Sequence, residues 1–229
     1  MFAEPSCQCT GLFFYRDREL AKKRIFCFID GFNLFHAIDD LRPKNNHLKW
    51  LDLNKLTKAF IIPSMEEIKA IYYFSAYATW LPKSHRTHQD YVKALQAVGV
   101  IPVMGRFKAK RRCCKAICRK HWISHEEKES DVNLALYILH HAHLNHYDKA
   151  IIITADSDLY PAINLIRNTF ANKEVMVLTP PNRYSIAREF RQNVTTRKMK
   201  VKHLQASLLP NQIYDSGRNL LVTIPNKYK

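Results

Sequence analysis

Aspartates follow short apolar runs at two places in the chain, where they could bind a divalent cation. Asp30 comes directly after the apolar residues 25–29, with Asn33 close behind it. Asp156 and Asp158 follow a second apolar run. Because ligands of open α/β sheets bind outside the carboxyl ends of parallel strands, we expect these side chains to meet at one edge of a sheet.

A third group of acids stands before an apolar segment with helical spacing and consists of Glu126, Glu127, Glu129 and Asp131. Acids in the first turn of a helix are favoured by free amide hydrogens and by the helix dipole, so capping accounts for part of this group. Carboxylates that converge in a cleft of low dielectric repel one another unless a cation joins them. Their convergence would imply Mg²⁺ or Mn²⁺, and such a site suits phosphodiester hydrolysis.

Strands and helices must alternate along the chain to place these acids. Apolar, β-rich runs predict strands at residues 25–29, 71–75, 100–104, 150–154 and 174–178. Segments with helical spacing or composition lie at residues 53–60, 85–98, 130–144, 160–168 and 184–191. This order predicts an α/β fold, a three-layer sandwich around a central, mainly parallel sheet of about five strands.

Length and charge limit the class of protein. A chain of 229 residues is long enough for one domain with an appendage. We expect an N-terminal extension over residues 1–24, the domain over 25–192 with an irregular basic insertion at 105–129, and an irregular basic tail over 193–229. Lysine and arginine number 36 against 20 acids, and such an excess attracts a polyanion, nucleic acid first.

Targeting signals and cysteines indicate the compartment. The early residues do not resemble a signal peptide, and no apolar run is long enough to cross a bilayer, so we expect a soluble, cytoplasmic protein without a membrane partner. In that reducing compartment, the six cysteines favour metal ligands or buried thiols over disulfides. The sequence does not fix the oligomeric state, and a dimer is compatible with it.

Three motifs together resemble a known family. They are Phe-Ile-Asp-Gly-Phe-Asn at residues 28–33, Glu-Glu-Lys-Glu-Ser-Asp-Val-Asn-Leu-Ala at 126–135 and Thr-Ala-Asp-Ser-Asp-Leu-Tyr-Pro-Ala-Ile at 154–163. In this order and spacing they resemble the NYN domain, in the LabA-like branch of the PIN-like nuclease superfamily, over about residues 25–190. The resemblance implies a parallel α/β sandwich, acidic residues that bind divalent metal, and ribonuclease activity.

The resemblance also assigns individual residues. Asp30 matches the acid after the first strand, and Asn33 matches the asparagine beside it. Asp131 matches the acid that opens the central helix, and Asp156 and Asp158 match the last acidic pair.

Three further positions qualify this match. Glu127 occupies the family's common Glu-Lys position, where it could either ligate metal or cap the helix. Ala155 stands where glycine is common. Tyr137 stands where many LabA-like members have another acid, which leaves fewer metal ligands.

These residues lead us to expect a metal-dependent endoribonuclease, a hydrolase. Asp30, Asp131 and Asp156 would hold Mg²⁺ or Mn²⁺, which activates a water molecule and stabilises charge on the phosphate, and Asp158 would ligate through water. Three polar side chains would orient the phosphate or the water by hydrogen bonds: Asn33, Thr154 and Ser157. The alternatives are an inactive RNA-binding module of the same fold, disabled by the missing helix acid, and a nuclease for DNA or a structured flap.

A cluster of cysteine and histidine in the insertion could hold structural zinc. Cys113, Cys114, Cys118 and His121 lie close together, and thiolate plus imidazole suits tetrahedral Zn²⁺. Relatives carry a Cys-x-x-Cys pair here, from which this version departs, and a cysteine at position 7 or 9 could replace one ligand. The other interpretation is a set of free thiols in a basic loop.

The insertion is also the main basic segment, with no acid from Pro102 through His125. Its charges would neutralise phosphates without reading sequence, and Phe107 and Trp122 could stack on the unpaired bases of single-stranded RNA. A solvated loop above packed aromatic rings is the alternative. The candidate phosphate contacts are Arg106, Lys108, Lys110, Arg111, Arg112, Lys115, Arg119 and Lys120, together with Arg183 in a later turn.

Overall fold

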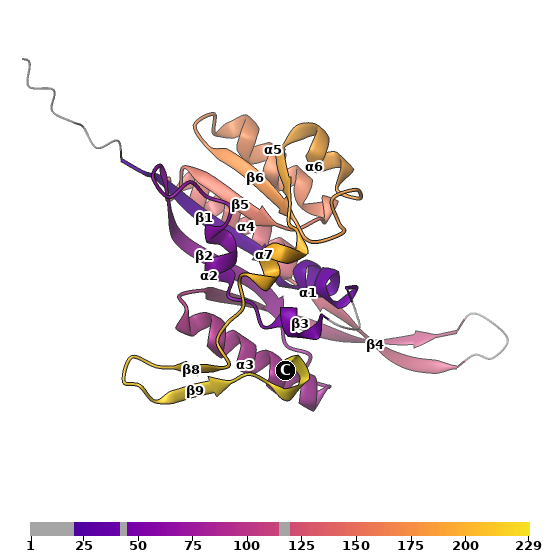
Figure 1. Ribbon diagram of the computed structural model, residues 1–229. Coiled ribbons are helices and arrows are strands. Elements are labelled where there is room, and N and C mark those ends of the chain that lie inside the picture. Colours follow the sequence, from indigo (N-terminus) through magenta and orange to yellow (C-terminus); the bar gives the residue numbers. More distant parts are fainter. Residues whose placement is uncertain (1–20, 42–44, 115–119) are drawn as a thin grey trace, which may run out of the picture.

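Strand β1 (Lys23–Asp30) lies at the centre of the protein, and both of its faces are apolar. Ile25, Cys27 and Ile29 point into one hydrophobic core, whereas Phe26 and Phe28 point into another. A strand that is buried on both faces needs helices above and below it. The computed structural model, which describes residues 21–41, 45–114 and 120–229, has this three-layer arrangement (Figure 1).

A seven-stranded sheet forms the middle layer, in the order β4-β3-β2-β1-β5-β6-β7. Neighbouring strands are parallel except for β3 and β4. The other strands of this sheet are β2 (Glu66–Ala76), β3 (Ile101–Cys113), β4 (His121–Lys128), β5 (Lys149–Ile153), β6 (Glu174–Thr179) and β7 (Thr195–Lys198). The predicted α/β sandwich with a mainly parallel sheet is confirmed, and β4 and β7 extend the sheet beyond the expected strands.

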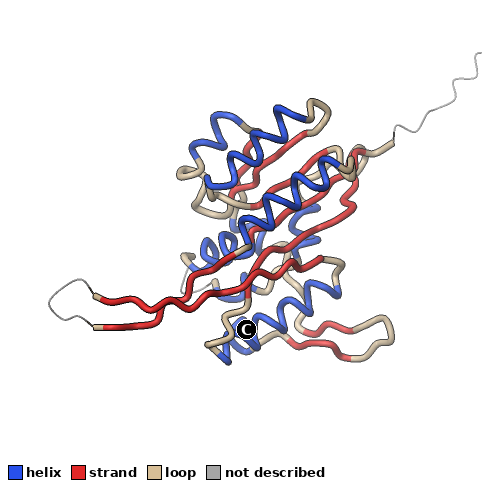
Figure 2. Tube along the Cα trace, turned by 180° about the vertical axis from the view of Figure 1, so that it is seen from behind, coloured by secondary structure: helices blue, strands red, loops and turns tan. Residues whose placement is uncertain are grey.

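Helices cover both faces of the sheet (Figure 2). The face of Ile25 carries α1 (Gly31–Asp39), α2 (Leu53–Lys58), α3 (Pro82–Ala97) and α7 (Val201–Gln205). The face of Phe26 carries α4 (Ser130–His143), α5 (Tyr160–Thr169) and α6 (Arg188–Asn193). Short 3-10 helices are η1 (Asn46–Lys49), η2 (Ser157–Leu159) and η3 (Asn226–Tyr228). Within the described residues, no helix has the length and apolar character that crossing a membrane requires.

The segment expected to be an irregular insertion is a β-hairpin instead. β3 and β4 pair antiparallel from Arg106 opposite Lys128 to Cys113 opposite His121. We call residues 106–113 and 121–128 the arm, and its outer part extends away from the rest of the fold (Figures 1 and 2). Most of the outer half of β3 is exposed, so its residues lack the apolar alternation by which a strand is recognised in sequence.

The expectation of an irregular tail after residue 192 is also wrong. β7 joins the main sheet, and β8 (Gln212–Tyr214) pairs with β9 (Leu220–Thr223) in a separate hairpin that contacts α3. Ile213 and Val222 of this hairpin pack with Trp50 and Tyr228 in a third hydrophobic cluster. The expected domain boundaries themselves stay a prediction.

Candidate functional site

Asp30 ends β1 and caps helix α1. Its Oδ1 accepts a hydrogen bond from the backbone nitrogen of Asn33 at 2.9 Å, which makes it the N-cap. Its Oδ2 accepts a hydrogen bond from the Thr154 hydroxyl at 3.0 Å. Asp30 is only 6% exposed, so its carboxyl group is both buried and fixed in orientation.

The end of β5 supplies the second half of this arrangement. Thr154 Oγ1, which donates to Asp30, also accepts from the backbone nitrogen of Asp156 at 3.0 Å. Asn33 Oδ1 accepts from the backbone nitrogen of Ala155 at 3.1 Å. Because β1 and β5 are neighbouring parallel strands, the first and last acidic motifs meet at one edge of the sheet, as the sequence predicts.

Gly31 allows the chain to turn tightly between β1 and α1. A Cβ atom at this position would lie 2.6 Å from the carbonyl oxygen of Phe74 and 2.6 Å from the ring of Tyr73. Real side chains do not approach so closely, so the start of α1 passes over the end of β2 only without a side chain here.

The carboxyl groups at this edge disfavour one another's charge. Burial, with smaller contributions from the charges of Asp131 and Asp156, raises the pKa of Asp30 to about 6. Burial likewise raises the pKa of Glu127 to about 7, with contributions from Asp131 and Asp30. The pKa of Asp131 is raised by burial and then by Asp156 and Asp158. The acids are therefore close enough to repel one another electrostatically.

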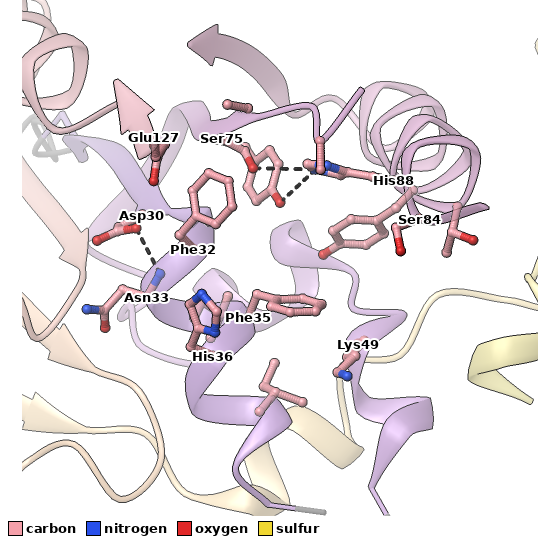
Figure 3. A pocket seen from close by; sticks show the side chains of 18 of the residues that line it. Asp30, Phe32, Asn33, Phe35, His36, Lys49, Ser75, Ser84, His88 and Glu127 are labelled. Carbon is pink, nitrogen blue, oxygen red and sulfur yellow. Dashed lines mark hydrogen bonds between the residues drawn. The ribbon is translucent and has the colours of Figure 1, made fainter. Parts of the chain in front are cut away.

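A cavity of about 770 Å³ opens at these carboxyl groups (Figure 3). Of the sequence-predicted site residues, Thr154 is buried beside the cavity, and Ser157 and Asp158 are exposed on η2. The predicted residues that line the cavity are Asp30, Asn33, Glu127, Asp131, Asp156 and Arg183.

The donor chemistry suits a hard cation, although the ligands are not preassembled. No three or more His, Cys, Asp or Glu side chains in the described ranges are arranged to hold a metal ion. The candidate ligands are nevertheless oxygen donors, which Mg²⁺ and Mn²⁺ prefer. Within the described part of the chain, Oε1 of Glu127 and Oγ of Ser130 are buried and have no hydrogen-bond partner. The Ser130 hydroxyl is nevertheless close enough to offset part of the raised pKa of Glu127. An added cation would satisfy such an oxygen.

Two acids expected at the start of the central helix belong to the base of the arm. Glu126 lies on β4 and forms ion pairs with three basic side chains, Lys110, Arg112 and Lys128. Glu129 precedes α4 with a φ of 82°, makes no side-chain cap, and pairs with Arg106 at 2.6 Å. Glu126 is not part of the helix start, Glu129 occupies the N-cap position without a side-chain cap, and Asp131 is the acid in the first turn of α4.

Tyr137 lies on the part of α4 that packs against the sheet. Its ring centroid is 5.4 Å from that of Tyr72 and 5.5 Å from that of Phe74. Tyr137 does not contribute to the cavity wall. The residue at this position therefore fills the core in this protein.

The arm carries the basic residues outward from the carboxyl groups. Phe107 pairs with Glu127 across the arm and lines the cavity, whereas Trp122 is 51% exposed farther out. Arg183 lines the cavity and forms an ion pair with Asp40. Arg106, Lys108, Lys110, Arg111 and Arg112 are on the arm and Lys120 directly precedes β4, while Lys115 and Arg119 fall outside the described residues.

The candidate zinc ligands lie at the outer end of the arm. Cys113 faces His121 in the last pair of the hairpin, with Sγ 3.8 Å from Nε2. Cys114 follows β3 directly, whereas Cys118 and the cysteines at positions 7 and 9 fall outside the described residues. Zinc binding stays a prediction.

Several residues of the cavity wall were missed from the sequence. Phe32, Phe35 and His36 lie on α1, where their spacing places them on neighbouring positions of one helix. The start of this helix had a sequence signal, because an aspartate such as Asp30 is a typical N-cap residue. The predicted helices do not include residues 31–39, so the sequence analysis does not place these rings at the site.

The NYN domain family matches residues 24–198. With its acidic edge and mainly parallel sheet, the chain belongs to the NYN domain family, within the PIN-like nuclease superfamily. Its assignment to the LabA-like branch stays a prediction.

Two individual proteins are similar to this chain. The 6-hydroxy-3-succinoylpyridine 3-monooxygenase HspA of Pseudomonas putida (strain DSM 28022 / S16) is 30% identical over 188 residues, covering 66% of this chain and 57% of HspA. A protein of unknown function from Vibrio parahaemolyticus RIMD 2210633 has a solved structure with a TM-score of 0.53 and 19% identity, covering 82% of this chain and 97% of that one. This second similarity supports the fold alone.

Proposed function

We propose that this protein is a metal-dependent endoribonuclease that hydrolyses phosphodiester bonds in single-stranded RNA. The observation that carries the proposal is the environment of Asp30, a buried carboxyl group whose pKa is raised by burial and by the charges of Asp131 and Asp156. A divalent cation would relieve this repulsion. Membership of a nuclease superfamily and the +16 charge of the chain support an anionic nucleic-acid substrate.

The proposed ligands of Mg²⁺ or Mn²⁺ are Asp30, Asp131 and Asp156, with Asp158 acting through a water molecule and Glu127 as an additional ligand. When bound, the cation would polarise the phosphate and lower the pKa of a water molecule. The exposed position of Asp158 on η2 is consistent with an indirect role.

The polar side chains would hold the site in place. Thr154 bonds to Asp30 and to the backbone of Asp156, so it fixes two candidate ligands relative to each other. Asn33 uses its oxygen to accept from Ala155, which leaves its NH₂ group as a donor for a phosphate oxygen. Ser157, exposed on η2, is proposed to orient water. None of these residues is assigned as a covalent nucleophile.

The proposal is tested by cleavage of labelled single-stranded RNA and matched DNA with Mg²⁺, Mn²⁺ or a chelator. The variants are Asp30→Asn and Asp156→Asn, and the matched control is Asp90→Asn on α3, away from the cavity wall. We expect cleavage of RNA by the wild type and by Asp90→Asn, at least a hundredfold less by the site variants, and none with chelator.

The outcomes separate the alternatives. A folded Asp30→Asn protein that cleaves RNA at the wild-type rate would overturn the mechanism. Salt-sensitive RNA binding without cleavage under any metal would establish the inactive RNA-binding module. Preferential cleavage of DNA or of a flap substrate would establish a different substrate class.

A second candidate function comes from the name of the Pseudomonas putida relative. HspA is named as a monooxygenase of a substituted pyridine, and the cavity of this chain has aromatic walls that suit a flat ring. The match covers 57% of that protein, so its activity can be transferred only as a proposal. Equilibrium dialysis with a hydroxypyridine tests it, and saturable binding that excludes RNA would favour it over the nuclease.

A structural zinc ion at the end of the arm is proposed separately. Cys113 and His121 are paired across the hairpin, and Cys114 and Cys118 are near in sequence. Metal analysis of protein purified without added metal tests this proposal. About one equivalent of zinc, lost in a Cys113→Ser variant, is expected, and a small fraction of an equivalent would contradict it.

A further inference from the structure

The cavity extends well beyond the carboxyl groups and has a second end that no acidic side chain of the described lining reaches. Its acidic end is formed by Asp30, Glu127, Asp131 and Asp156. The other end is formed by Ser75 of β2 and by Ser84, Thr87 and His88 of α3. Figure 3 shows Asp30 and Glu127 on one side of the cavity and His88 and Ser84 on the other. The two ends differ in charge and therefore in the groups they can bind.

The second end of the cavity has uncharged side chains that can donate and accept hydrogen bonds. His88 Nε2 lies 3.4 Å from the hydroxyl of Tyr73 and 3.4 Å from that of Ser75. Burial, with a smaller contribution from His85, lowers the pKa of His88 to about 4, so the imidazole is neutral near pH 7. Neutral donors and acceptors of this kind match the edge of a heteroaromatic ring better than they match a phosphate.

Aromatic rings connect the two ends. Phe32 meets Phe107 edge to face, with ring centroids 5.6 Å apart. Phe35 lines the cavity and remains 37% exposed, with Lys49 Nζ 4.7 Å from its ring centroid. Aromatic side chains exposed in a groove provide surfaces on which nucleobases stack.

We propose that this part of the cavity is a nucleobase pocket, which holds one unpaired base of the RNA whose phosphate lies at the acidic end. Phe35 and Phe32 provide the stacking surface, and His88 with Ser84 and Thr87 contacts the polar edge of the base. This inference rests on the proposed function, because it places the base beside a phosphate bound at the carboxyl groups. It adds base recognition to a site whose basic arm cannot read sequence.

The dimensions and continuity of the cavity support this occupant. Its volume of about 770 Å³ falls within the range of about 300–1,000 Å³ that is typical of small-ligand sites, which is room for a nucleotide. The acidic and neutral ends belong to one cavity, so a base and its own phosphate can occupy both. Lys49, Arg183 and Lys227 also line the cavity, and Lys49 and Arg183 form ion pairs with Asp39 and Asp40, which weakens their attraction for a second phosphate.

The test uses binding without cleavage. Fluorescent single-stranded RNA oligonucleotides with a cleavage-resistant phosphorothioate backbone, each with one abasic residue at a different position, are titrated in Mg²⁺ with wild type, Phe35→Ala, Phe35→Trp and the control Tyr214→Ala. Tyr214 is an exposed aromatic residue of β8, outside the cavity wall. Circular dichroism verifies that each variant is folded.

The expected result is a coupling between one base and one ring. A single abasic position should weaken binding by the wild type, Phe35→Trp and Tyr214→Ala at least fivefold, as expected for loss of one stacked base. Phe35→Ala should bind the intact oligonucleotide at least fivefold more weakly than the wild type does. An abasic residue at the sensitive position should not weaken binding by this variant any further. The pocket would be overturned if an abasic residue weakened binding equally at every position. It would also be overturned if the abasic residue weakened binding by Phe35→Ala as much as binding by the wild type.

Two further measurements distinguish this inference from the proposed function. With A, C, G and U at the sensitive position, wild type should discriminate among bases and His88→Ala should not. Cleavage in Mg²⁺ is measured separately, so base coupling without cleavage would contradict the nuclease and retain the pocket. Cleavage without coupling would contradict the pocket alone, and the absence of RNA binding would overturn both.

Discussion

The hydroxyl of Thr154 donates a hydrogen bond to Asp30 and accepts one from the backbone of Asp156, so one side chain joins the two strands that carry the acidic motifs. Thr154 is fully buried. Its position explains how separate segments of the chain keep their carboxyl groups in a fixed relation despite mutual repulsion.

Replacing Thr154 with valine should destabilise the fold and disturb the site. The substitution keeps the shape but removes both hydrogen bonds, and a buried group left without its partner costs about 1–3 kcal/mol. It should also raise the pKa of Asp30 further, because this hydrogen bond favours the charged carboxylate. Urea unfolding and carboxyl titration by NMR measure the two effects.

Thr154→Ser restores the hydroxyl and should recover most of the loss. The matched control is Thr196→Val on β7, which removes a hydrogen bond to the nearby carbonyl of Val194. Equal stability of Thr154→Val and wild type, with an unchanged Asp30 titration, would show that the hydrogen bond does not hold the site.

Adding a methyl group at Gly31 should displace the start of α1. The new Cβ would meet the Phe74 carbonyl and the Tyr73 ring at 2.6 Å, and relief of such overpacking typically costs about 1–3 kcal/mol. Thermal unfolding of Gly31→Ala should show a lower Tm, and RNA cleavage should fall because Asp30 moves with the turn. Gly217→Ala, whose nearest neighbour is the flexible side chain of Asn219 at 3.2 Å, should change both much less.

The stability of a Glu127→Gln variant should depend on pH in a defined direction. Burial raises the pKa of Glu127 to about 7, whereas an unfolded glutamate has a pKa of about 4.3. An acid with a raised pKa makes the folded protein lose stability as pH rises between those values. The variant should therefore be more stable than wild type at pH 8, and this advantage should shrink as pH falls to 4.

Urea unfolding at pH 4 and pH 8 measures this difference. Added Mg²⁺ should reduce the advantage of the variant at pH 8, because the cation stabilises the wild-type carboxylate. The matched control is Glu67→Gln on β2, an exposed glutamate paired with Lys69. A variant advantage that is the same at both pH values would contradict the raised pKa.

Charges on the arm should determine the salt dependence of RNA binding. Lys108 and Arg111 are exposed on β3, and each phosphate contact to single-stranded RNA contributes about 0.7 to the slope of log affinity against log salt. Replacing both with serine should lower the magnitude of the slope by about 1.4, twice the single-contact value. Fluorescence anisotropy at several KCl concentrations measures it, and Lys93→Ser on α3 should leave the slope unchanged.

Much of the fold could be predicted because its central strands have a strong local signal. The apolar run at residues 25–29 is buried on both sides. Asp30 follows this run and Asp156 follows the neighbouring strand β5, so the ends of two paired strands position both acids. The arm could not be predicted in this way, since most of its outer β3 residues face solvent and it is held by cross-strand hydrogen bonds and ion pairs such as Arg112 with Glu126. The local pattern of apolar residues indicates which strands are buried, whereas the pairing of exposed strands depends on a partner elsewhere in the chain.

The candidate site also contains some residues that local sequence predicts and others that it does not. Asp30 and Asp156 were predicted because each acid is adjacent to its own strand in sequence. His88 and Phe35 were missed because they reach the cavity from helices α3 and α1, away from the acids in sequence or on a helix that was not predicted. Their role depends on how α1 and α3 pack, which no local pattern of residues specifies.

The wall of the cavity also includes Lys227 and Tyr228, and Tyr228 packs in the third hydrophobic cluster with Trp50 rather than in either core of the sheet. Asp30 and this wall thus belong to different packing units. A fluctuation that loosens the third cluster would open the cavity while the sheet stays folded. We therefore expect access to the site to depend on the local stability of the C-terminal segment, and amide exchange around β8 and β9 should be faster than in β1.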